Sequence, residues 1–260
     1  MKEYKMRQSR VLKKLRAGET AISIKLNSSD VRVCELAAMT GFDCVWSDME
    51  HVPNDYNVVE MQRYCCSMYD VDLMVRVQRG SYSDYVKPLE LGATGIMVLH
   101  IMSAQDARDV VKMTRFHPIG LRPWDGGNAD GLYCKVESDV YLEQSNSQRF
   151  VIVQIEDPEP LDELDEICEV EGIDMILFGP GDFSQAIGAP GQFDDKRLLD
   201  AREQVANTAR KHGIFAGTVG GPGNYKQLVD MGYNFLNVGA DVVALSNYFE
   251  DIIEQIDKIK

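Results

Sequence analysis

Two acidic residues, Glu156 and Asp182, follow two consecutive strand-like segments of the chain. Residues 151–156, VIVQIE, are apolar and β-branched, and residues 174–178, DMILF, form the next buried run, with apolar residues at helical spacing in between. A strand–helix–strand unit of this length makes its strands parallel neighbours, about 5 Å apart. The two carboxylates then leave the same end of the sheet, where they suit one hard divalent cation such as Mg²⁺ or Mn²⁺. Two solvated loop acids would produce the same pattern, so this interpretation needs support from other residues.

Further polar residues occur at the predicted ends of other strands. His51 follows a second strand, Arg76 lies at the end of a third, and Gln154 precedes Glu156. A histidine can act as a base near neutral pH, and an arginine supplies a fixed positive charge beside a developing oxyanion. The Gly-Pro-Gly turn that contains Gly181 offers free backbone N–H groups to a carboxylate. Together with a Lewis-acidic metal, this set predicts proton abstraction next to the carbonyl of a 2-oxo acid.

The elements that position these residues alternate between strand and helix along the whole chain. Eight strands with intervening helices in one domain, residues 1–260, favour a (β/α)₈ TIM barrel over an open doubly wound sheet. No Gly-x-Gly-x-x-Gly segment follows the first strand, which argues against a dinucleotide site. We expect the strands at residues 21–26, 42–47, 73–77, 95–99, 151–156, 174–178, 214–218 and 235–238, and an amphipathic closing helix at residues 242–259.

Composition excludes several classes of partner. The 260 residues are 45% hydrophobic, which is enough for a full core, and the net charge of −14 argues against nucleic acid and anionic membranes. The sequence has no apolar run near 18 residues, and its first residues are too charged for a signal peptide. The six cysteines lack the spacing of a zinc site, so we expect free thiols in a reducing cytoplasm.

The motifs themselves are familiar. The chain resembles the HpcH/HpaI aldolase family from about residue 10 to residue 246, through the segments GFDCVWSDMEHVPND, VRVQRG, VIVQIE, EGIDMILFGPGDFSQAIGAPG and MGYNFLNVGAD. The resemblance implies a class II aldolase that depends on Mg²⁺, Mn²⁺ or Co²⁺ and cleaves a 4-hydroxy-2-oxo acid to pyruvate and an aldehyde. It also implies a hexamer, a trimer of dimers that exchange their C-terminal helices.

The resemblance assigns a role to each matching position. It makes His51 the catalytic base, Arg76 the residue that stabilises the transition state, and Glu90 the acid that raises the basicity of the histidine. The metal ligands would be Glu156 and Asp182, and pyruvate would contact Gln154, Gly181 and Asp182.

Two departures from the family pattern concern the part of the site that receives the aldehyde. Residues 120–128, GLRPWDGGN, replace a segment that the resemblance places near the substrate mouth, and His100 stands where a methionine is usual. Two other functions therefore remain open: a different pyruvate-enolate or acyl-thioester carbon–carbon lyase, and a non-catalytic barrel that binds a metal and a 2-oxo acid. A Schiff-base aldolase would need a lysine at a strand end, and Lys25 is the clearest candidate.

Overall fold

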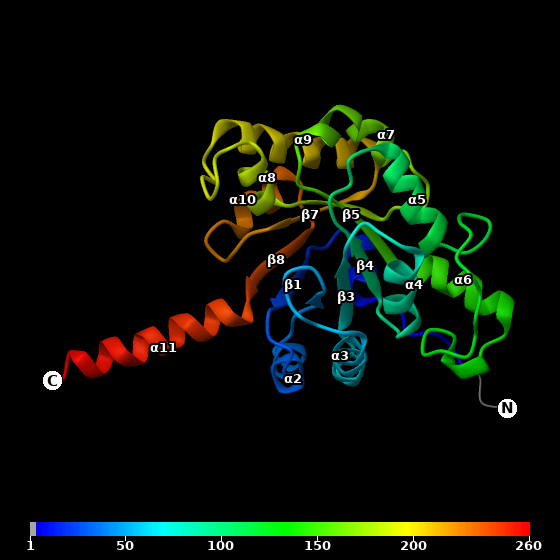
Figure 1. Ribbon diagram of the computed structural model, residues 1–260, viewed down its shortest axis with the longest axis horizontal. Coiled ribbons are helices and arrows are strands. Elements are labelled where there is room, and N and C mark those ends of the chain that lie inside the picture. Colours follow the sequence, from blue (N-terminus) through cyan, green and yellow to red (C-terminus); the bar gives the residue numbers. More distant parts are fainter. Residues whose placement is uncertain (1–3) are drawn as a thin grey trace.

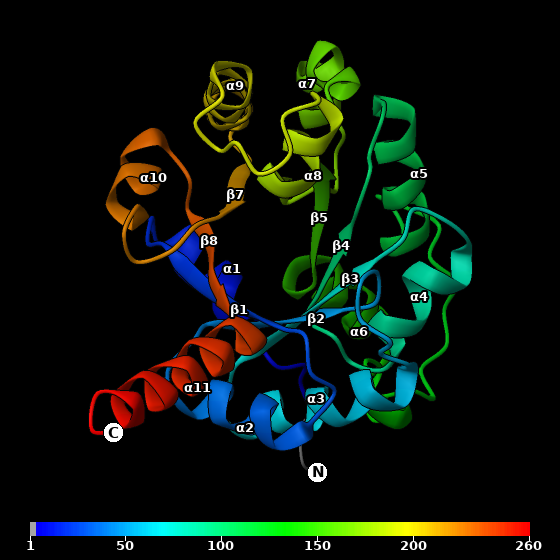
Figure 2. The same ribbon diagram turned by 60° about the vertical axis from the view of Figure 1, so that its left-hand side comes forward.

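The structure is a computed structural model that describes residues 4–260. Within these residues eight parallel strands close into one barrel in chain order, which confirms the predicted (β/α)₈ fold. Figures 1 and 2 show the helices surrounding the strands. The strands are β1 (Ala21–Leu26), β2 (Cys44–Asp48), β3 (Asp72–Val77), β4 (Gly95–Val98), β5 (Phe150–Ile155), β6 (Met175–Phe178), β7 (Phe215–Val219) and β8 (Phe235–Ala240).

The helices are α1 (Arg10–Arg16), α2 (Val31–Met39), α3 (Tyr56–Met68), α4 (Tyr82–Glu90), α5 (Ala104–Thr114), α6 (Ser138–Gln148), α7 (Leu164–Cys168), α8 (Pro180–Ala186), α9 (Lys196–His212), α10 (Tyr225–Met231) and α11 (Asp241–Asp257), with short 3₁₀ turns η1 (Leu132–Cys134) and η2 (Glu159–Glu163). Helix α1 precedes β1, helices α2 to α10 lie in the connections between strands, and α11 follows β8. None of the helices within residues 4–260 is both long and apolar enough to cross a membrane.

Two apolar cores support the barrel. Alternation along each strand sends one set of side chains outward, where they pack against the helices, and the other set inward. The inward set fills the barrel as a solid core of Cys44, Trp46, Met74, Met97, Phe150, Ile152, Met175, Leu177 and Phe235. Gly95 leaves room for the Phe150 ring, since a Cβ at Gly95 would lie 1.9 Å from it. The polar ends of the strands therefore stand above a filled floor.

The N-terminal segment closes the other end of the barrel. Asp72, at the start of β3, is fully buried and accepts hydrogen bonds from the Ser9 hydroxyl at 2.6 Å and the Val11 N–H at 2.9 Å. Asp43 similarly pairs with Arg10 at 2.9 Å and Lys14 at 2.8 Å. These contacts hold α1 across the amino ends of the strands.

The atypical segment at residues 120–128 belongs to the loop between α5 and α6, which lies at this closed end within one chain and not at the mouth as the resemblance implied. Asp130 of the loop is fully buried and pairs with Arg122 at 3.0 Å and with Arg149 at 2.7 Å. Arg149 directly precedes β5, so the loop is anchored beside the amino end of that strand. The physical reason is the direction of α5, which carries the chain back from the carboxyl end of β4.

Helix α11 extends away from the barrel toward the C-terminus (Figure 1). It confirms the predicted closing helix and carries a long exposed apolar surface, defined by Val242, Val243, Leu245, Tyr248, Phe249, Ile252, Ile253, Ile256 and, just beyond the helix, Ile259. The only buried residue of the helix is Asp241, which accepts the N–H groups of Asn27 and Ser28 at 2.7 and 3.0 Å. These bonds fix the start of α11 to the loop after β1.

Candidate active site

A cavity of about 430 Å³ opens at the carboxyl ends of the strands. This is the end of a (β/α)₈ barrel where loops assemble active sites. The cavity brings together the predicted residues His51, which follows β2, Arg76 on β3, Gln154 on β5, and Gly181 and Asp182 in the first turn of α8. Its other lining residues are Lys25, Asn27, Trp46, Gly179, Pro180, Phe193, Val219, Asn237, Gly239, Ala240 and Val243.

Glu156 lies at the end of β5 and is fully buried. One carboxylate oxygen accepts the His100 backbone N–H at 3.0 Å, and the other accepts the side-chain amide of Gln154. Burial, the largest effect, raises the pKa of Glu156 to about 7. His100 lowers this pKa, while the negative charges of Asp182 and Glu50 raise it further. The carboxylates of Glu156 and Asp182 therefore repel each other, as expected of two acids that share one site.

The turn after β6 needs Gly179 for steric reasons. A Cβ at this position would lie 2.8 Å from both the Gln154 amide nitrogen and a Glu156 carboxylate oxygen. Pro180 then starts α8, where a proline is favoured because the first N–H groups of a helix have no partner in it. Asp182 falls in the first turn of this helix, which favours a negative charge.

The chemistry of this pair fits a hard divalent cation. Both donors are carboxylates, the oxygen ligands that Mg²⁺ and Mn²⁺ prefer, and a cation would relieve the repulsion between them. The carbonyl oxygen of the Gln154 side chain is also buried and has no hydrogen-bond partner in the described chain. Between residues 4 and 260 no three His, Cys, Asp or Glu side chains form a ready metal cluster. A cation held here would complete its shell with oxygens of substrate and water.

Asp48 organises the charged residues on the opposite part of the cavity wall. Its carboxylate, at the end of β2, is fully buried and receives Arg76 Nε at 2.9 Å and Nη2 at 2.7 Å. Lys25 Nζ lies 2.8 Å from the same carboxylate. Burial alone would raise the pKa of Asp48, but the hydrogen bonds and charges of Arg76 and Lys25 outweigh this effect and lower it to about 2. The remaining guanidinium nitrogen of Arg76 lies 2.9 Å from Glu50. Arg76 is thus held rigidly at the mouth.

His51 lies at the rim of the cavity. Its Nε2 atom is 3.4 Å from a carboxylate oxygen of Glu50, and more than half of the side chain is exposed. Because Glu50 also contacts Arg76, one acidic residue connects the histidine with the buried arginine. His51 is therefore open to a ligand in the cavity, as a base must be.

Neither His100 nor Glu90 is among the residues that line the cavity. The His100 side chain is 40% exposed, and its Nδ1 atom lies 2.7 Å from Asp157. Burial lowers the pKa of His100, but the hydrogen bond to Asp157 and the charge of Glu156 outweigh this and raise it. Glu90 ends α4, which runs away from the mouth, so the structure does not bring it together with His51 within one chain. Glu90 instead borders a hollow with Tyr56 and Tyr133.

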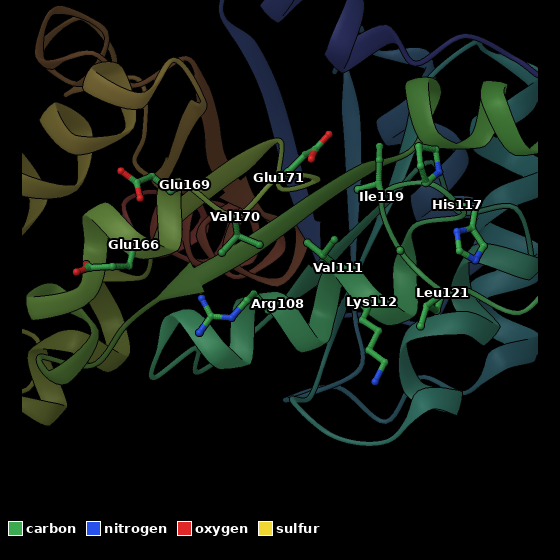
Figure 3. Close-up of a pocket in the computed structure, with 12 residues that line it drawn as sticks. Arg108, Val111, Lys112, His117, Ile119, Leu121, Glu166, Glu169, Val170 and Glu171 are labelled. Carbon is green, nitrogen blue, oxygen red and sulfur yellow. The ribbon is translucent and has the colours of Figure 1, made fainter.

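A larger hollow, about 580 Å³, lies away from the mouth and contains none of the predicted site residues. Figure 3 shows Arg108 and Lys112 of α5 on one side, and Glu166 and Glu169 from the region of α7 on the other. Helices α5 and α7 lie outside the barrel and carry the chain back toward the amino ends of the strands. The hollow between them therefore belongs to the outer layer, near the closed end. Its size alone does not make it the catalytic site.

Asp48 was missing from the residues predicted for the mouth, and Lys25 was named there only as the lysine that a Schiff-base aldolase would need. Both stand at the ends of predicted strands, and this position was the available signal. Asp48 follows the apolar residues of its strand and precedes His51 in the segment SDMEH. An acid at the end of a buried strand needs a cationic partner, and this was the signal for its pairing with Arg76 and Lys25.

Comparison with known proteins gives consistent results. The family model HpcH/HpaI aldolase/citrate lyase matches residues 24–247. The 2-keto-3-deoxy-L-rhamnonate aldolase of Klebsiella pneumoniae is 32% identical over 231 residues, 87% of this chain and 85% of that protein. The protein of the same name from Escherichia coli K12 is 31% identical over 238 residues, 90% of this chain and 88% of the relative. A solved HpcH/HpaI aldolase/citrate lyase family protein from Burkholderia cenocepacia superposes with a TM-score of 0.87 at 27% identity, covering 95% of this chain and 99% of the other. The HpcH/HpaI aldolase from Desulfitobacterium hafniense gives 0.88 at 25% identity, covering 95% and 96%.

Proposed function

This chain belongs to the HpcH/HpaI aldolase/citrate lyase family, a family of carbon–carbon lyases, and we propose that it is a class II aldolase dependent on a divalent metal. Its substrate would be a 4-hydroxy-2-oxo acid, which it cleaves to pyruvate and an aldehyde or forms from them. The observation that carries this proposal is the convergence of His51, Arg76, Gln154 and Asp182 on one cavity beside the buried carboxylate of Glu156.

Glu156 and Asp182 would hold the metal, Mg²⁺, Mn²⁺ or Co²⁺. When bound, a divalent cation supplies a Lewis acid that polarises the 2-oxo group. The residues around it bind the pyruvate part of the substrate. Gln154 contributes a buried amide, and the backbone N–H groups at Gly181 and Asp182, in the first turn of α8, face a carboxylate.

Arg76 stabilises the charge that develops on the 2-oxo oxygen. Its guanidinium is buried, and its hydrogen bonds to Asp48 fix its orientation before the substrate binds. A donor that is already oriented spends no free energy on reorganisation during the reaction, which is why such groups are effective. Asp48 therefore acts as a positioning residue through Arg76.

His51 moves the proton. In the cleavage direction it removes the proton of the C4 hydroxyl, the C3–C4 bond breaks, and the electron pair of that bond forms the enolate of pyruvate as the aldehyde leaves. The enolate then takes up a proton at C3 and becomes pyruvate. In the opposite direction His51 removes a proton from the methyl group of pyruvate. A base in position contributes about 10²–10⁴-fold to the rate of such steps.

We further propose that the exposed apolar surface of α11 is covered by another copy of the chain. Nine large apolar side chains stand exposed between Val242 and Ile259, more than a lone chain in water commonly leaves on one helix. An exchange of these helices within dimers, with three dimers in a hexamer, would bury this surface.

The proposed function predicts that the enzyme exchanges the methyl protons of pyruvate with solvent in the absence of any aldehyde. NMR in D₂O with Mg²⁺, Mn²⁺ or EDTA measures this exchange. We expect exchange only with metal, and a loss of about 100-fold or more in His51→Ala. The matched control is His117→Ala, because His117 is exposed and lies at the hollow near the closed end. Binding of pyruvate without exchange in any metal would overturn the aldolase and favour a non-catalytic binding protein.

A further inference from the structure

His100 has a backbone conformation that residues other than glycine rarely adopt. Its φ angle is +49°, in the left-handed region, at the turn where the chain leaves β4. Histidine is one of the few side chains that tolerate this region, but the conformation still costs free energy. Such a residue keeps its conformation only when the contacts around it hold it there. The contacts of His100 therefore indicate what the turn is for.

The left-handed turn directs two consecutive N–H groups toward the end of β5. The Leu99 N–H bonds to the last residue of β3 at 3.3 Å, and in extended backbone the following N–H groups would alternate between the two neighbouring strands. Instead, the His100 N–H reaches a carboxylate oxygen of Glu156 at 3.0 Å, and the Ile101 N–H reaches the Gln154 carbonyl at 3.3 Å. The positive φ of His100 thus aims a main-chain donor at the buried acid.

The ring of the same residue binds the next acid in the chain. The His100 Nδ1 atom lies 2.7 Å from a carboxylate oxygen of Asp157, which directly follows Glu156. The distance from Nδ1 to Glu156 is 3.6 Å, too long for a hydrogen bond. His100 therefore holds two consecutive acids, Glu156 through its main chain and Asp157 through its ring. The bond to Asp157 is a contact that can hold the strained turn in place.

This arrangement fixes the carboxylate of Glu156 on both sides. One oxygen accepts the His100 N–H, and the other accepts the side-chain amide of Gln154. A carboxylate has about four lone-pair sites, so about two remain free for a cation. The direction of these free sites is set by the two donors before any cation binds.

We propose that His100 is a positioning residue for the metal ligand Glu156, and that Asp157 anchors its ring. This inference rests on the proposed function, which assigns a metal to Glu156. His100 does not line the cavity, so it acts through Glu156 and not on the substrate. Groups that orient a metal ligand usually change metal affinity about 10- to 100-fold when they are removed.

Titration of the metal-free protein with Mn²⁺, with the free ion measured by EPR, tests this role. His100→Ala and Asp157→Ala should each weaken Mn²⁺ binding about 10- to 100-fold. Loss of an imidazole cannot make the surroundings of a cation less negative, so weaker binding in His100→Ala reports lost positioning and not lost charge. His100→Gly, which adopts a positive φ without strain, should bind Mn²⁺ more tightly than His100→Ala.

The double variant and a control distinguish the contact from general effects. His100→Ala/Asp157→Ala should bind Mn²⁺ no more weakly than His100→Ala alone, because both changes break one contact. If Asp157 acted only through its charge, the two losses would add. The control is His212→Ala, which breaks another histidine–aspartate pair, with Asp165 at 2.5 Å on the outer surface, and should keep the affinity of the wild type.

Pyruvate proton exchange gives a second readout. Saturating Mn²⁺ should restore most of the exchange rate of His100→Ala, because the variant impairs metal binding and not the proton transfer. An exchange rate that stays low at every Mn²⁺ concentration, with unchanged affinity, would show that the ring acts in the chemistry and would overturn the positioning role.

The outcomes separate this inference from the proposed function. If the wild type binds no Mn²⁺, or if Glu156→Gln binds it equally well, the proposed metal site itself is wrong. If Glu156→Gln loses binding while His100→Ala or Asp157→Ala keeps it, only the role of His100 is overturned. Additive losses in the double variant, or equal affinities of His100→Gly and His100→Ala, lead to the same conclusion.

Discussion

Replacement of Asp48 by asparagine removes the negative charge that holds two cations at the barrel mouth while nearly preserving the shape of the side chain. In the wild type the carboxylate is fully buried and contacts Arg76 through two hydrogen bonds and Lys25 through one ion pair. The variant leaves a buried guanidinium without its counter-charge. Removing one partner of a buried pair costs about 3–5 kcal/mol of folding free energy.

The lowered pKa of Asp48 gives a second measure of the same interaction. A value of about 2, in place of the ordinary 3.8, corresponds to ~2.5 kcal/mol of stability at neutral pH. Because the pKa is lower in the folded state, this stabilisation is complete above about pH 5 and is lost as the pH falls toward 2. About 1 kcal/mol of it is already lost at pH 3.

Denaturant unfolding at pH 7 and pH 3, at one protein concentration, measures these quantities. We expect Asp48→Asn to lower the free energy of unfolding by ~2.5–4 kcal/mol at pH 7, and the difference from the wild type to shrink by about 1 kcal/mol at pH 3. The control is Asp230→Asn, whose exposed pair with Lys226 should contribute less than about 1 kcal/mol. A loss below about 1 kcal/mol at pH 7, or a loss that does not change with pH, would refute the reasoning.

Two further predictions concern the metal turn and the exposed helix. Gly179→Ala places a Cβ 2.8 Å from a carboxylate oxygen of Glu156, so metal-dependent exchange of pyruvate protons should fall about 100-fold, while Gly223→Ala, which meets nothing within 4 Å, should keep it. Equal exchange rates in the two variants would contradict the steric role of Gly179. Phe249→Glu adds a charge to the apolar surface of α11 at a side chain that is 59% exposed in the single chain, so the chain should fold but sediment as a smaller species than the wild type. An unchanged sedimentation coefficient would contradict the proposed covering of that surface.

The barrel and most of its mouth could be predicted because both depend on local patterns. The strand predicted at residues 21–26 has the bounds of β1, and Glu156 was predicted from its position after the apolar run of β5. His51, Arg76, Gln154 and Asp182 followed from the rule that the carboxyl ends of parallel strands meet on one face, and the cavity brings them together.

The remaining features depend on directions and contacts that spacing along the chain does not encode. The role that the resemblance gives to Glu90 stays a prediction, because α4 runs opposite to β3 and carries Glu90 away from His51 within one chain. The segment at residues 120–128 lies at the closed end of its own chain for a similar reason, because a helix returns the chain to that end before the next strand begins. The shared use of Asp48 by two cations from different strands is a tertiary contact, and no pattern within one strand predicts it.

The segment that closes the amino end of the barrel limits how ligands enter and leave the cavity. With α1 anchored to Asp72 and Asp43, and a filled apolar floor beneath the mouth, a ligand has a single route in and out. Gln154 is almost fully buried at the base of this route, and His51 is exposed at its rim. Two products that share one exit must leave in sequence, the outer one first. In the proposed reaction pyruvate, held deeper, would then bind first in synthesis and depart last in cleavage, which predicts an ordered kinetic mechanism.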